Sequence, residues 1–496
     1  MRAAVQAAAA LLAGAAQTFA FAPFEAWWLQ IAALALLVHL ARDAGPARAG
    51  VLGWLFGTGW LAAGLWWLYI SMHAYGGMPG WLAALAVLAL AAALALYYAI
   101  ALALWARLRS GRALGDAALF AACWLLAELA RASFFTGFPW IASGYAHAVG
   151  PLAAWAPWIG VYGISALAAW LAFALAALPR ALPRTARIGL AAVAALWLSA
   201  AAWLPRGFTE STGELGVSLL QPAVAQDLKF DPARMQANLQ ALVRQIAEAR
   251  GTLVVAPESV IPFTRAEIDL VAWMRLAQPF EGSGRALLIG LFVGNAQDGY
   301  VNSVVGIGGA DEYHYGKRHL LPFGEFVPPG FRWFVDLLRI PLGDQAQGTS
   351  SAALAVGGQR VRPLICYEDL FGEDIVESVV GDAPATVFAN VSNLAWFGQW
   401  LVQDQHLQFS QMRALEFERP VVRSTNTGAT AVVDHHGRVT ARLAQGVAGT
   451  LDARVEGRVG ATPYARWLAA FGLWPLVLLA ALALLLGSGR RRPLVN

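Results

Sequence analysis

The sequence contains unusually little charge. Charged residues make up 13% of its 496 residues and hydrophobic residues 58%, whereas globular proteins average about 25% charged and about 45–50% apolar residues. This composition argues against an ordinary soluble enzyme and against a disordered chain. The net charge of +4 is small and basic runs are confined to short loops, which argues against a nucleic-acid-binding surface.

Cysteine and lysine are also scarce. The two cysteines, Cys123 and Cys366, cannot build a disulfide framework, and they lie in segments of different polarity, so we do not expect them to pair. The two lysines, Lys229 and Lys317, stand among 33 arginines. Because arginine evidently serves wherever a plain positive charge suffices, a retained lysine indicates a need for a compact ammonium, or for one that can lose its proton.

Metal and nucleotide signatures are missing from the sequence. The eight histidines show no HxxxH or HExxH spacing, no CxxC occurs, and there is no GxxxxGK[ST] loop. We therefore expect neither a metal site nor a cofactor.

The charges that are present divide the chain. Residues 1–205 hold ten Arg, no Lys and four acidic residues, and nearly all other charges lie between 206 and 466. This distribution predicts a membrane part and a water-soluble part. We expect a bundle of seven transmembrane helices at 1–205, a soluble domain at 206–462, and an eighth helix with a basic tail at 463–496.

Eight apolar runs approach the roughly 20 residues that a helix needs to cross a bilayer core. Met1–Ala22 also has features of a signal peptide, but we expect it to stay as the first helix. The predicted spans lie near residues 3–22, 27–41, 50–71, 81–105, 114–134, 156–179, 187–204 and 467–486.

Arginines lie in alternate loops between these spans, and the first and third loops have neither Arg nor Lys. By the positive-inside rule, the arginine-bearing loops and both termini are cytoplasmic. Seven spans then place residues 206–462 on the outer side of the membrane, which in a bacterium is the periplasm. In the fifth span, Glu128 and Arg131 lie three residues apart, which predicts a helix ion pair or a contact with a lipid headgroup.

The water-soluble region alternates β-branched runs with amphipathic helices, which is typical of a layered α/β domain. Asp231 and Pro232 supply an N-cap and a first-turn proline for a helix that ends near Arg250. DHHG at 434–437 predicts a turn between two strands. Further helices are expected near residues 267–278, 331–338, 372–380 and 403–418.

Three polar residues stand out in this region. Glu258 ends the run TLVVAPE, Cys366 ends RPLIC, and Lys317 lies in the turn-rich stretch YGKRHLLPFGEFVP. A thiol with a pKa of about 8.5 needs a base to become nucleophilic, and an ammonium stabilises a thiolate or an oxyanion. The three together suffice for acyl transfer. The pattern alone leaves open a core Cys, a capping Glu and a solvated Lys.

Longer motifs resemble a known family. PES (257–259), YGKRHLLPFGEFVP (315–328) and ICYEDLF (365–371) are similar to the nitrilase superfamily, also called carbon–nitrogen hydrolases. FAPFEAWWL, WWLYISMHAYGGMP, FFTGFPW, SNLAWFG and RALEFERPVVRSTNTG extend the resemblance over nearly the whole chain and narrow it to the bacterial apolipoprotein N-acyltransferases.

The resemblance implies an αββα sandwich domain in the periplasm, joined to a bundle of eight helices in the inner membrane of a Gram-negative bacterium. It implies that Glu258 is the general base, Lys317 the oxyanion stabiliser and Cys366 the nucleophile. Phe230 stands where the family often has Trp, and Leu394 where Asp is common. The positions that we expect to support the three residues or to contact substrate are Glu325, Tyr367, Glu368, Phe230 and Trp396.

The implied reaction transfers an acyl chain from a phospholipid, from the sn-1 position of phosphatidylethanolamine, through a thioester to the α-amine of a diacylglyceryl-cysteine apolipoprotein. The expected partners are these two substrates and membrane lipid, with no nucleic acid, and we expect a monomer. The alternative is a membrane-tethered amidase or nitrilase that uses water as acceptor. A third interpretation, a non-catalytic lipoprotein-binding scaffold, fits poorly with an intact set of Glu258, Lys317 and Cys366.

Overall fold

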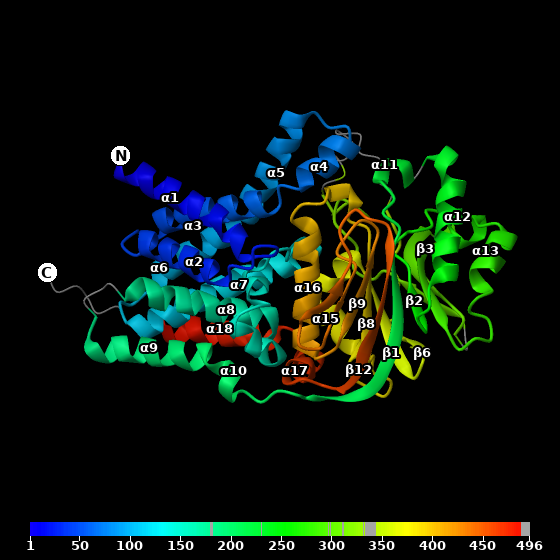
Figure 1. Ribbon diagram of the computed structural model, residues 1–496. Coiled ribbons are helices and arrows are strands. Elements are labelled where there is room, and N and C mark those ends of the chain that lie inside the picture. The colour runs from blue at the N-terminus through cyan, green and yellow to red at the C-terminus, as the bar shows by residue number, and fades with distance from the viewer. Residues whose placement is uncertain are drawn as a thin grey trace. The chain divides into compact units, whose positions relative to one another are not determined.

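The computed structural model describes residues 1–178, 182–229, 231–295, 297, 299–309, 312–330, 332 and 344–487. The chain divides into two compact units. One comprises Met1–Arg206 together with Ala470–Asn496, and the other comprises Gly207–Ala469. Figure 1 labels their elements: the first unit is built of helices, and the second of two sheets with flanking helices.

The helices of the first unit are mostly apolar and are joined by short loops and 3-10 turns. In chain order its α-helices are α1 (Arg2–Gln17), α2 (Trp27–Ala41), α3 (Pro46–Gly64), α4 (Leu68–Ile70), α5 (Gly80–Leu94), α6 (Leu96–Leu108), α7 (Ala113–Ser133), α8 (Ala156–Ala177), α9 (Arg184–Leu198), α10 (Ala200–Trp203) and α18 (Trp474–Gly487).

Two glycines let α1 and α3 cross closely. A Cβ atom on Gly14 would lie 1.9 Å from the backbone oxygen of Phe56, and one on Gly59 would lie 2.1 Å from that of Leu11. Small residues at such crossings are typical of membrane helices, which associate by close backbone packing because apolar side chains gain little by leaving lipid. Larger residues at either position would separate the two helices.

A buried ion pair lies on α7. The side chains of Glu128 and Arg131 are 0% exposed and pair at 3.1 Å, which confirms the ion pair predicted from their spacing. Glu128 also accepts a hydrogen bond from the Ser143 hydroxyl at 2.9 Å, and Arg131 donates to the backbone oxygens of Phe138 and Trp140 at 2.7 and 2.9 Å. The pair therefore ties the chain after α7 back to that helix.

The described residues contain fewer uninterrupted apolar spans than the eight that the sequence predicts. Four helical stretches are long and apolar enough to cross a membrane, and up to six are if each broken helix pair is one span. The predicted second span is a 15-residue helix, and the predicted last span breaks at Gly472, whose φ is +58°. The four are Ala3–Ala20, Gly80–Leu108, Ala113–Thr136 and Pro151–Ala177; the broken pairs are Pro46–Gly64 with Leu68–Tyr75 and Pro463–Phe471 with Trp474–Gly487.

Within its described residues, the second unit contains two six-stranded sheets, with strand orders β12-β1-β2-β3-β4-β5 and β11-β10-β9-β8-β7-β6. Parallel pairing joins β1, β2 and β3 in one sheet and β7, β8 and β9 in the other, and the remaining pairs are antiparallel. The strands are β1 (Thr209–Gln221), β2 (Leu253–Val255), β3 (Ala286–Asn295), β4 (Gly299–Ile307), β5 (Tyr313–Gly316), β6 (Leu354–Val356), β7 (Gln359–Ile365), β8 (Val387–Ser392), β9 (Val421–Thr425), β10 (Ala431–Val433), β11 (Val439–Arg442) and β12 (Gly449–Gly460).

Alternating side chains bury both faces of the first sheet. Leu253 and Val255 of β2 pack between the sheets with Ile365 of β7, whereas Val254 packs on the opposite face with Leu242 of α12. Period-two alternation produces this division, because successive side chains in a strand point to opposite faces. The α-helices of this unit are α11 (Gln226–Lys229), α12 (Pro232–Glu248), α13 (Leu270–Ala277), α15 (Gly372–Ile375), α16 (Val402–Phe417) and α17 (Pro463–Phe471).

Helices cover the outer faces of the two sheets. In Figure 1, α12 and α13 lie outside β2 and β3, and α16 lies beside β8 and β9 on the other side. The layer order is therefore helix, sheet, sheet, helix, as the resemblance implies. Two interior layers, one between the sheets and one under α12 and α13, fix the strand ends on which the site is built.

Several local predictions are confirmed in this unit. Asp231 caps α12 by accepting a hydrogen bond from the Ala233 N–H at 2.9 Å, and DHHG joins β10 to β11. The predicted helices near 267–278 and 403–418 correspond to α13 and α16. The one near 372–380 is shorter, since α15 ends at Ile375 and a 3-10 turn follows. The predicted helix at 331–338 lies almost entirely outside the described residues.

Candidate active site

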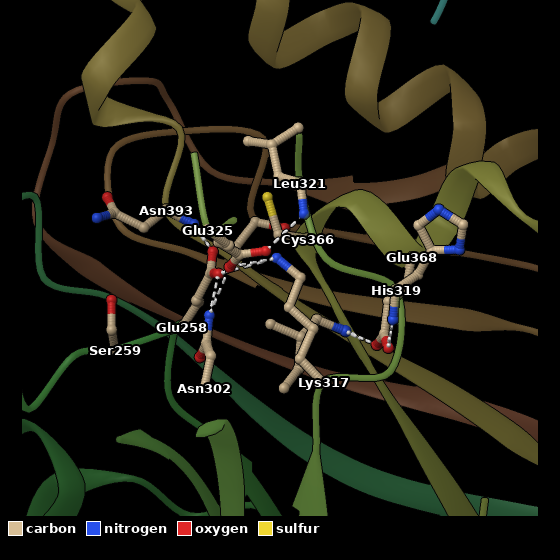
Figure 2. Close-up of polar contacts among 12 residues, drawn as sticks. Glu258, Ser259, Asn302, Lys317, His319, Leu321, Glu325, Cys366, Glu368 and Asn393 are labelled. Carbon is tan, nitrogen blue, oxygen red and sulfur yellow. Dashed lines mark hydrogen bonds and ion pairs between the residues drawn. The ribbon is translucent and has the colours of Figure 1, made fainter. Parts of the chain in front are cut away.

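Three strand ends bring together the carboxylate, the ammonium and the thiol that the sequence singles out. Glu258 lies just beyond β2, Lys317 directly follows β5, and Cys366 directly follows β7. Figure 2 shows their side chains converging on one point, with Glu325 beside them. Because β2 and β5 belong to one sheet and β7 to the other, the site depends on the pairing of the two sheets.

The Lys317 ammonium lies between two carboxylates. Its Nζ atom is 2.7 Å from Oε1 of Glu325 and 3.7 Å from Oε1 of Glu258, and the residue is 1% exposed. Burial by itself lowers the pKa of Lys317, but the negative charges of Glu325 and Glu258 raise it, and the net pKa lies above the ordinary lysine value. Lys317 therefore keeps its proton and acts as a fixed positive charge.

Two amides orient the Glu258 carboxylate. Its Oε1 accepts a hydrogen bond from Nδ2 of Asn302 at 2.8 Å, and its Oε2 accepts one from the backbone N–H of Asn393 at 2.9 Å. The residue is 8% exposed. Asn302 also donates to Oε1 of Glu325 at 3.2 Å, so one side chain of β4 links both carboxylates. These bonds fix the orientation in which Glu258 meets its neighbours.

Glu325 is fixed by its own turn. Its Oε2 accepts a hydrogen bond from the backbone N–H of Leu321 at 2.8 Å, and its backbone oxygen accepts one from Gln345 at 2.8 Å. Its Oε1 therefore faces the ammonium of Lys317 (Figure 2). This carboxylate is held as a structural counterion.

Cys366 occupies a left-handed backbone conformation with φ +52°, which is costly for a residue with a side chain. The thiol is partly exposed at the end of β7. Although the residue is partly exposed, desolvation by the surrounding protein raises the pKa of the Cys366 thiol well above its ordinary value, and Glu258 raises it further, whereas Lys317 lowers it. The resting thiol therefore carries its proton and lies next to a carboxylate able to accept it.

Glu368 binds backbone and a phenol. It accepts hydrogen bonds from the Tyr315 hydroxyl at 2.8 Å and from the backbone N–H groups of Arg318 and His319 at 2.7 and 3.3 Å. Its second oxygen accepts from the Ile365 N–H at 2.7 Å. Glu368 thus joins the loop that carries the ammonium to the strand that carries the thiol, and it acts on both through the backbone.

The other residues that the sequence singles out differ in their exposure. Tyr367 is 1% exposed and packs its ring on Phe371 at 5.2 Å between centroids. Trp396 is 36% exposed in a turn, and Leu394 beside it is 1% exposed. Phe230 lies outside the described residues. Within the described residues, no group of three or more His, Cys, Asp or Glu side chains is placed to hold a metal ion.

Lys229 is the other of the two lysines for which the sequence indicates a compact ammonium or one that can lose its proton. Its Nζ donates a hydrogen bond to the Ser259 hydroxyl at 2.9 Å, and it lines a largely apolar pocket together with Glu258. Burial lowers the pKa of Lys229 to about 8, although Glu258 opposes the shift. Asn302 and Asn393 were not predicted at all; the only local signal was an Asn within a strand, where this residue is disfavoured.

Comparison with known proteins covers both units. The apolipoprotein N-acyltransferase N-terminal domain family matches residues 13–174, and the carbon-nitrogen hydrolase family matches residues 216–464. Among solved structures, a CN-hydrolase superfamily protein from Xanthomonas campestris matches 52% of this chain and 96% of its own, with 18% identity and a TM-score of 0.37.

Curated relatives extend over nearly the whole chain. The apolipoprotein N-acyltransferases of Ralstonia nicotianae and Verminephrobacter eiseniae are each 47% identical to it, over 96% and 94% of this chain and 92% of their own lengths. That of Bordetella bronchiseptica is 41% identical over 97% of this chain and 96% of its own. Identity at this level and coverage, with a family match in each unit, shows that the chain belongs to the apolipoprotein N-acyltransferases, membrane acyltransferases of lipoprotein maturation.

Proposed function

We propose that this acyltransferase works in two steps through a thioester on Cys366, with Glu258 as general base and Lys317 as oxyanion stabiliser. The donor is a phospholipid, the sn-1 chain of phosphatidylethanolamine, and the acceptor is the α-amine of a diacylglyceryl-cysteine apolipoprotein. The observation that carries this proposal is the buried Lys317 ammonium, 2.7 Å from Glu325 and 3.7 Å from Glu258, beside a partly exposed thiol.

In the first step, Glu258 takes the thiol proton while the sulfur of Cys366 attacks the ester carbonyl of the donor. The raised pKa of the thiol supports proton transfer during attack rather than a preformed thiolate. The Lys317 ammonium stabilises the oxyanion. When the ester C–O bond breaks, Glu258 returns the proton to the leaving glycerol oxygen, which gives a lysophospholipid and an acyl thioester.

In the second step, the neutral α-amine of the acceptor attacks the thioester carbonyl. Glu258 accepts a proton from the attacking nitrogen and delivers it to the departing sulfur of Cys366, so the thiol is restored and an amide is formed. The thioester bond breaks as the C–N bond forms, and no oxidant or reductant is consumed. A covalent intermediate between two substrates predicts ping-pong kinetics.

The neighbouring residues have supporting roles in this proposal. Glu325 fixes the ammonium of Lys317, and Glu368 fixes the backbone around it, as their hydrogen bonds indicate. Tyr367, the residue after the proposed nucleophile, packs its ring on Phe371. Phe230 and Trp396 are proposed to contact lipid. Trp396, which is 36% exposed, presents a large apolar surface next to the segment that orients Glu258.

The proposed membrane arrangement has eight spans, with residues 1–205 and 463–496 holding the membrane helices and 206–462 forming the periplasmic catalytic domain. Both termini are cytoplasmic. This assignment rests on the alternation of arginine-bearing and arginine-free loops. Alkaline phosphatase fused after each predicted span tests it, since the enzyme is active only outside the cytoplasm. An active fusion at the C-terminus would overturn the proposal.

The chemical proposal is tested by mass spectrometry of the purified protein incubated with phosphatidylethanolamine and no acceptor. We expect a hydroxylamine-labile acyl adduct on Cys366, discharged on addition of a diacylated lipopeptide. Cys366→Ser is the control. An adduct that decays rapidly in water would instead support the hydrolase alternative, and no adduct on a folded protein would overturn the donor or the nucleophile.

A further inference from the structure

Helix α16 carries a buried polar surface that the proposed mechanism does not use. Most of its polar side chains are inaccessible to solvent, although such groups are costly to bury without partners. His406 is one of them and is 0% exposed. The buried polar residues of this helix include Gln403, Gln405, His406, Gln408, Ser410, Gln411, Arg413 and Glu416.

His406 contacts the backbone of the proposed nucleophile. Its Nε2 atom lies 3.1 Å from the backbone oxygen of Cys366. Its Nδ1 atom lies 2.6 Å from an Nη2 atom of Arg423. A guanidinium has only donors, so Nδ1 must accept, and the single ring proton resides on Nε2. Nε2 therefore donates to Cys366, and the tautomer is fixed by the arginine.

Arg423 is itself fixed by a buried carboxylate. Its Nη1 atom lies 2.9 Å from Oδ2 of Asp369, and both side chains are 0% exposed. The Ser410 hydroxyl of α16 hydrogen-bonds to both of them. A continuous chain of contacts thus runs from Asp369 through Arg423 and His406 to Cys366. Burial and the charge of Arg423 lower the pKa of His406 well below its ordinary value, which keeps the ring neutral.

The contacted carbonyl belongs to a strained peptide. Cys366 has φ +52°, a conformation that is costly for a residue with a side chain and persists only where the surroundings enforce it. Asn390 reinforces the contact by donating to the same oxygen at 3.4 Å. In a trans peptide the N–H points opposite to the carbonyl, so anchoring this oxygen also directs the Tyr367 N–H away from His406.

We propose that His406, held as its Nε2–H tautomer by Arg423 and Asp369, is a positioning residue that anchors the Cys366–Tyr367 peptide and aims the sulfur for attack. The inference rests on the proposed role of Cys366 as nucleophile. It assigns a role in the first step to the buried face of α16, which acts on Cys366 through the backbone oxygen of that residue.

The test compares acyl-adduct formation on Cys366 in His406→Gln and His406→Leu, with phosphatidylethanolamine as donor. Glutamine retains an N–H donor and an acceptor, whereas leucine has neither. The matched control is Gln411→Leu, which removes another buried polar side chain of α16, one that donates to the Gly437 carbonyl at 2.9 Å. Maximal acylation rate, donor half-saturation and thermal unfolding are measured for each.

We expect His406→Leu to lower the maximal acylation rate about 100-fold, the cost of a small misplacement of a reacting group. Donor half-saturation should be unchanged, thermal unfolding should match Gln411→Leu, and His406→Gln should stay close to the unsubstituted protein. Acylation by His406→Leu at the rate of Gln411→Leu would overturn the inference and leave the proposed function standing. Absence of any Cys366 adduct in the unsubstituted protein would overturn both.

A second pair of variants decides the matter if His406→Leu does not fold. The side chains introduced by His406→Gln and His406→Glu have the same shape. The ionised glutamate, however, only accepts hydrogen bonds and pairs with Arg423. The inference requires the glutamate variant to acylate far more slowly than the glutamine variant. Equal acylation rates in two folded variants would contradict it, because the donated hydrogen bond would then have no effect on the nucleophile.

Discussion

Each unit of this protein buries a small cluster of charged side chains, and the two clusters differ in their charge balance. In the helical unit, one arginine, Arg131, pairs with one carboxylate, Glu128. In the α/β unit, one ammonium, Lys317, faces two carboxylates, Glu258 and Glu325. The balanced pair is bound to neighbouring hydroxyl and backbone groups, whereas the unbalanced cluster lies beside a thiol.

The difference in balance explains the difference in role. Removing the charge of either member of a one-to-one pair would leave the other charge buried without a partner, which is strongly unfavourable. In the two-to-one cluster around Lys317, the carboxylates raise the pKa of the neighbouring Cys366 thiol, and Glu258 lies where it can take the thiol proton during attack. Buried charged side chains therefore form a structural ion pair in one unit and, in the proposed mechanism, a base beside a nucleophile in the other.

The largest expected effect on acylation comes from neutralising Glu258, one of the two carboxylates around Lys317. In Glu258→Gln, the Cys366 thiol should ionise at lower pH, because a neighbouring negative charge that raises its pKa is lost. Acylation should nevertheless fall about 10²–10⁴-fold, the usual contribution of a general base. Thiolate absorbance is measured as a function of pH, with Cys366→Ala as the blank, and adduct formation is measured on the same variant. The first measurement checks the lowered thiol pKa, and the second checks the slower acylation. A variant that ionises more readily and also acylates faster would show that the thiolate is preformed.

The next effect concerns the positive charge of the same cluster. Lys317→Met should reduce acylation about 10²–10³-fold, because an oxyanion donor is lost. The thiol pKa should rise further, since Lys317 lowers it. The triple change Lys317→Met with Glu258→Gln and Glu325→Gln provides a neutral control for folding. Near-normal acylation in Lys317→Met would mean that the ammonium serves only to hold the carboxylates.

The balanced pair should affect stability rather than chemistry. Arg131→Met leaves Glu128 buried without its cation, which costs about 3–5 kcal/mol of folding free energy. Thermal unfolding should show this loss, while any folded fraction keeps its acylation rate per molecule. The double change Arg131→Met with Glu128→Gln should recover part of the loss, since no unpaired charge remains. A reduced rate in fully folded protein would reveal a functional role for this pair.

The smallest effect tests the second lysine near Glu258. Because burial lowers the pKa of Lys229 from 10.5 to about 8, the unfolded chain binds more protons than the folded protein between these values. Stability contributed by this group should therefore rise with pH across that window, by about 3 kcal/mol in all, and be lowest below pH 8.

Lys229→Met removes this titration and Lys229→Arg retains the charge throughout, so the two variants bracket the effect. Thermal unfolding of the unsubstituted protein should approach that of Lys229→Met as the pH rises through the window. Parallel curves for the two proteins would contradict a lowered pKa. The result also shows how much of the charge imbalance around Glu258 this second ammonium offsets.

Local signals located the proposed reactive residues but not the groups that orient them. Glu258 and Cys366 follow apolar runs that end at loops, and this pattern is visible in a short window. Their partners come from far along the chain: Asn302 lies 44 positions and Asn393 135 positions from Glu258. His406 lies 40 positions from Cys366. The sequence indicates only that none of the histidines has the spacing of metal ligands. Such pairings depend on strand order, which no local pattern contains.

Helix continuity was another property that composition did not determine. The apolar runs predict eight spans, but the structure breaks several of them, at Gly472 for example, where φ is +58°. A hydropathy window measures the cost of exposing side chains to water and is insensitive to one residue with unusual backbone dihedrals. The number of spans therefore stays a proposal, whereas the presence of apolar helices is established.

The sequence by itself determined the division into an apolar and a charged region, the elements with a strict two-residue or helical period, and the family. These follow from side-chain hydrophobicity and local backbone preference, which act over a few residues. Only the tertiary structure decided the charge balance around Lys317 and the anchoring of Cys366 from α16. Electrostatic and hydrogen-bond energies depend on distances between atoms, and folding alone sets those distances for residues far apart in the chain.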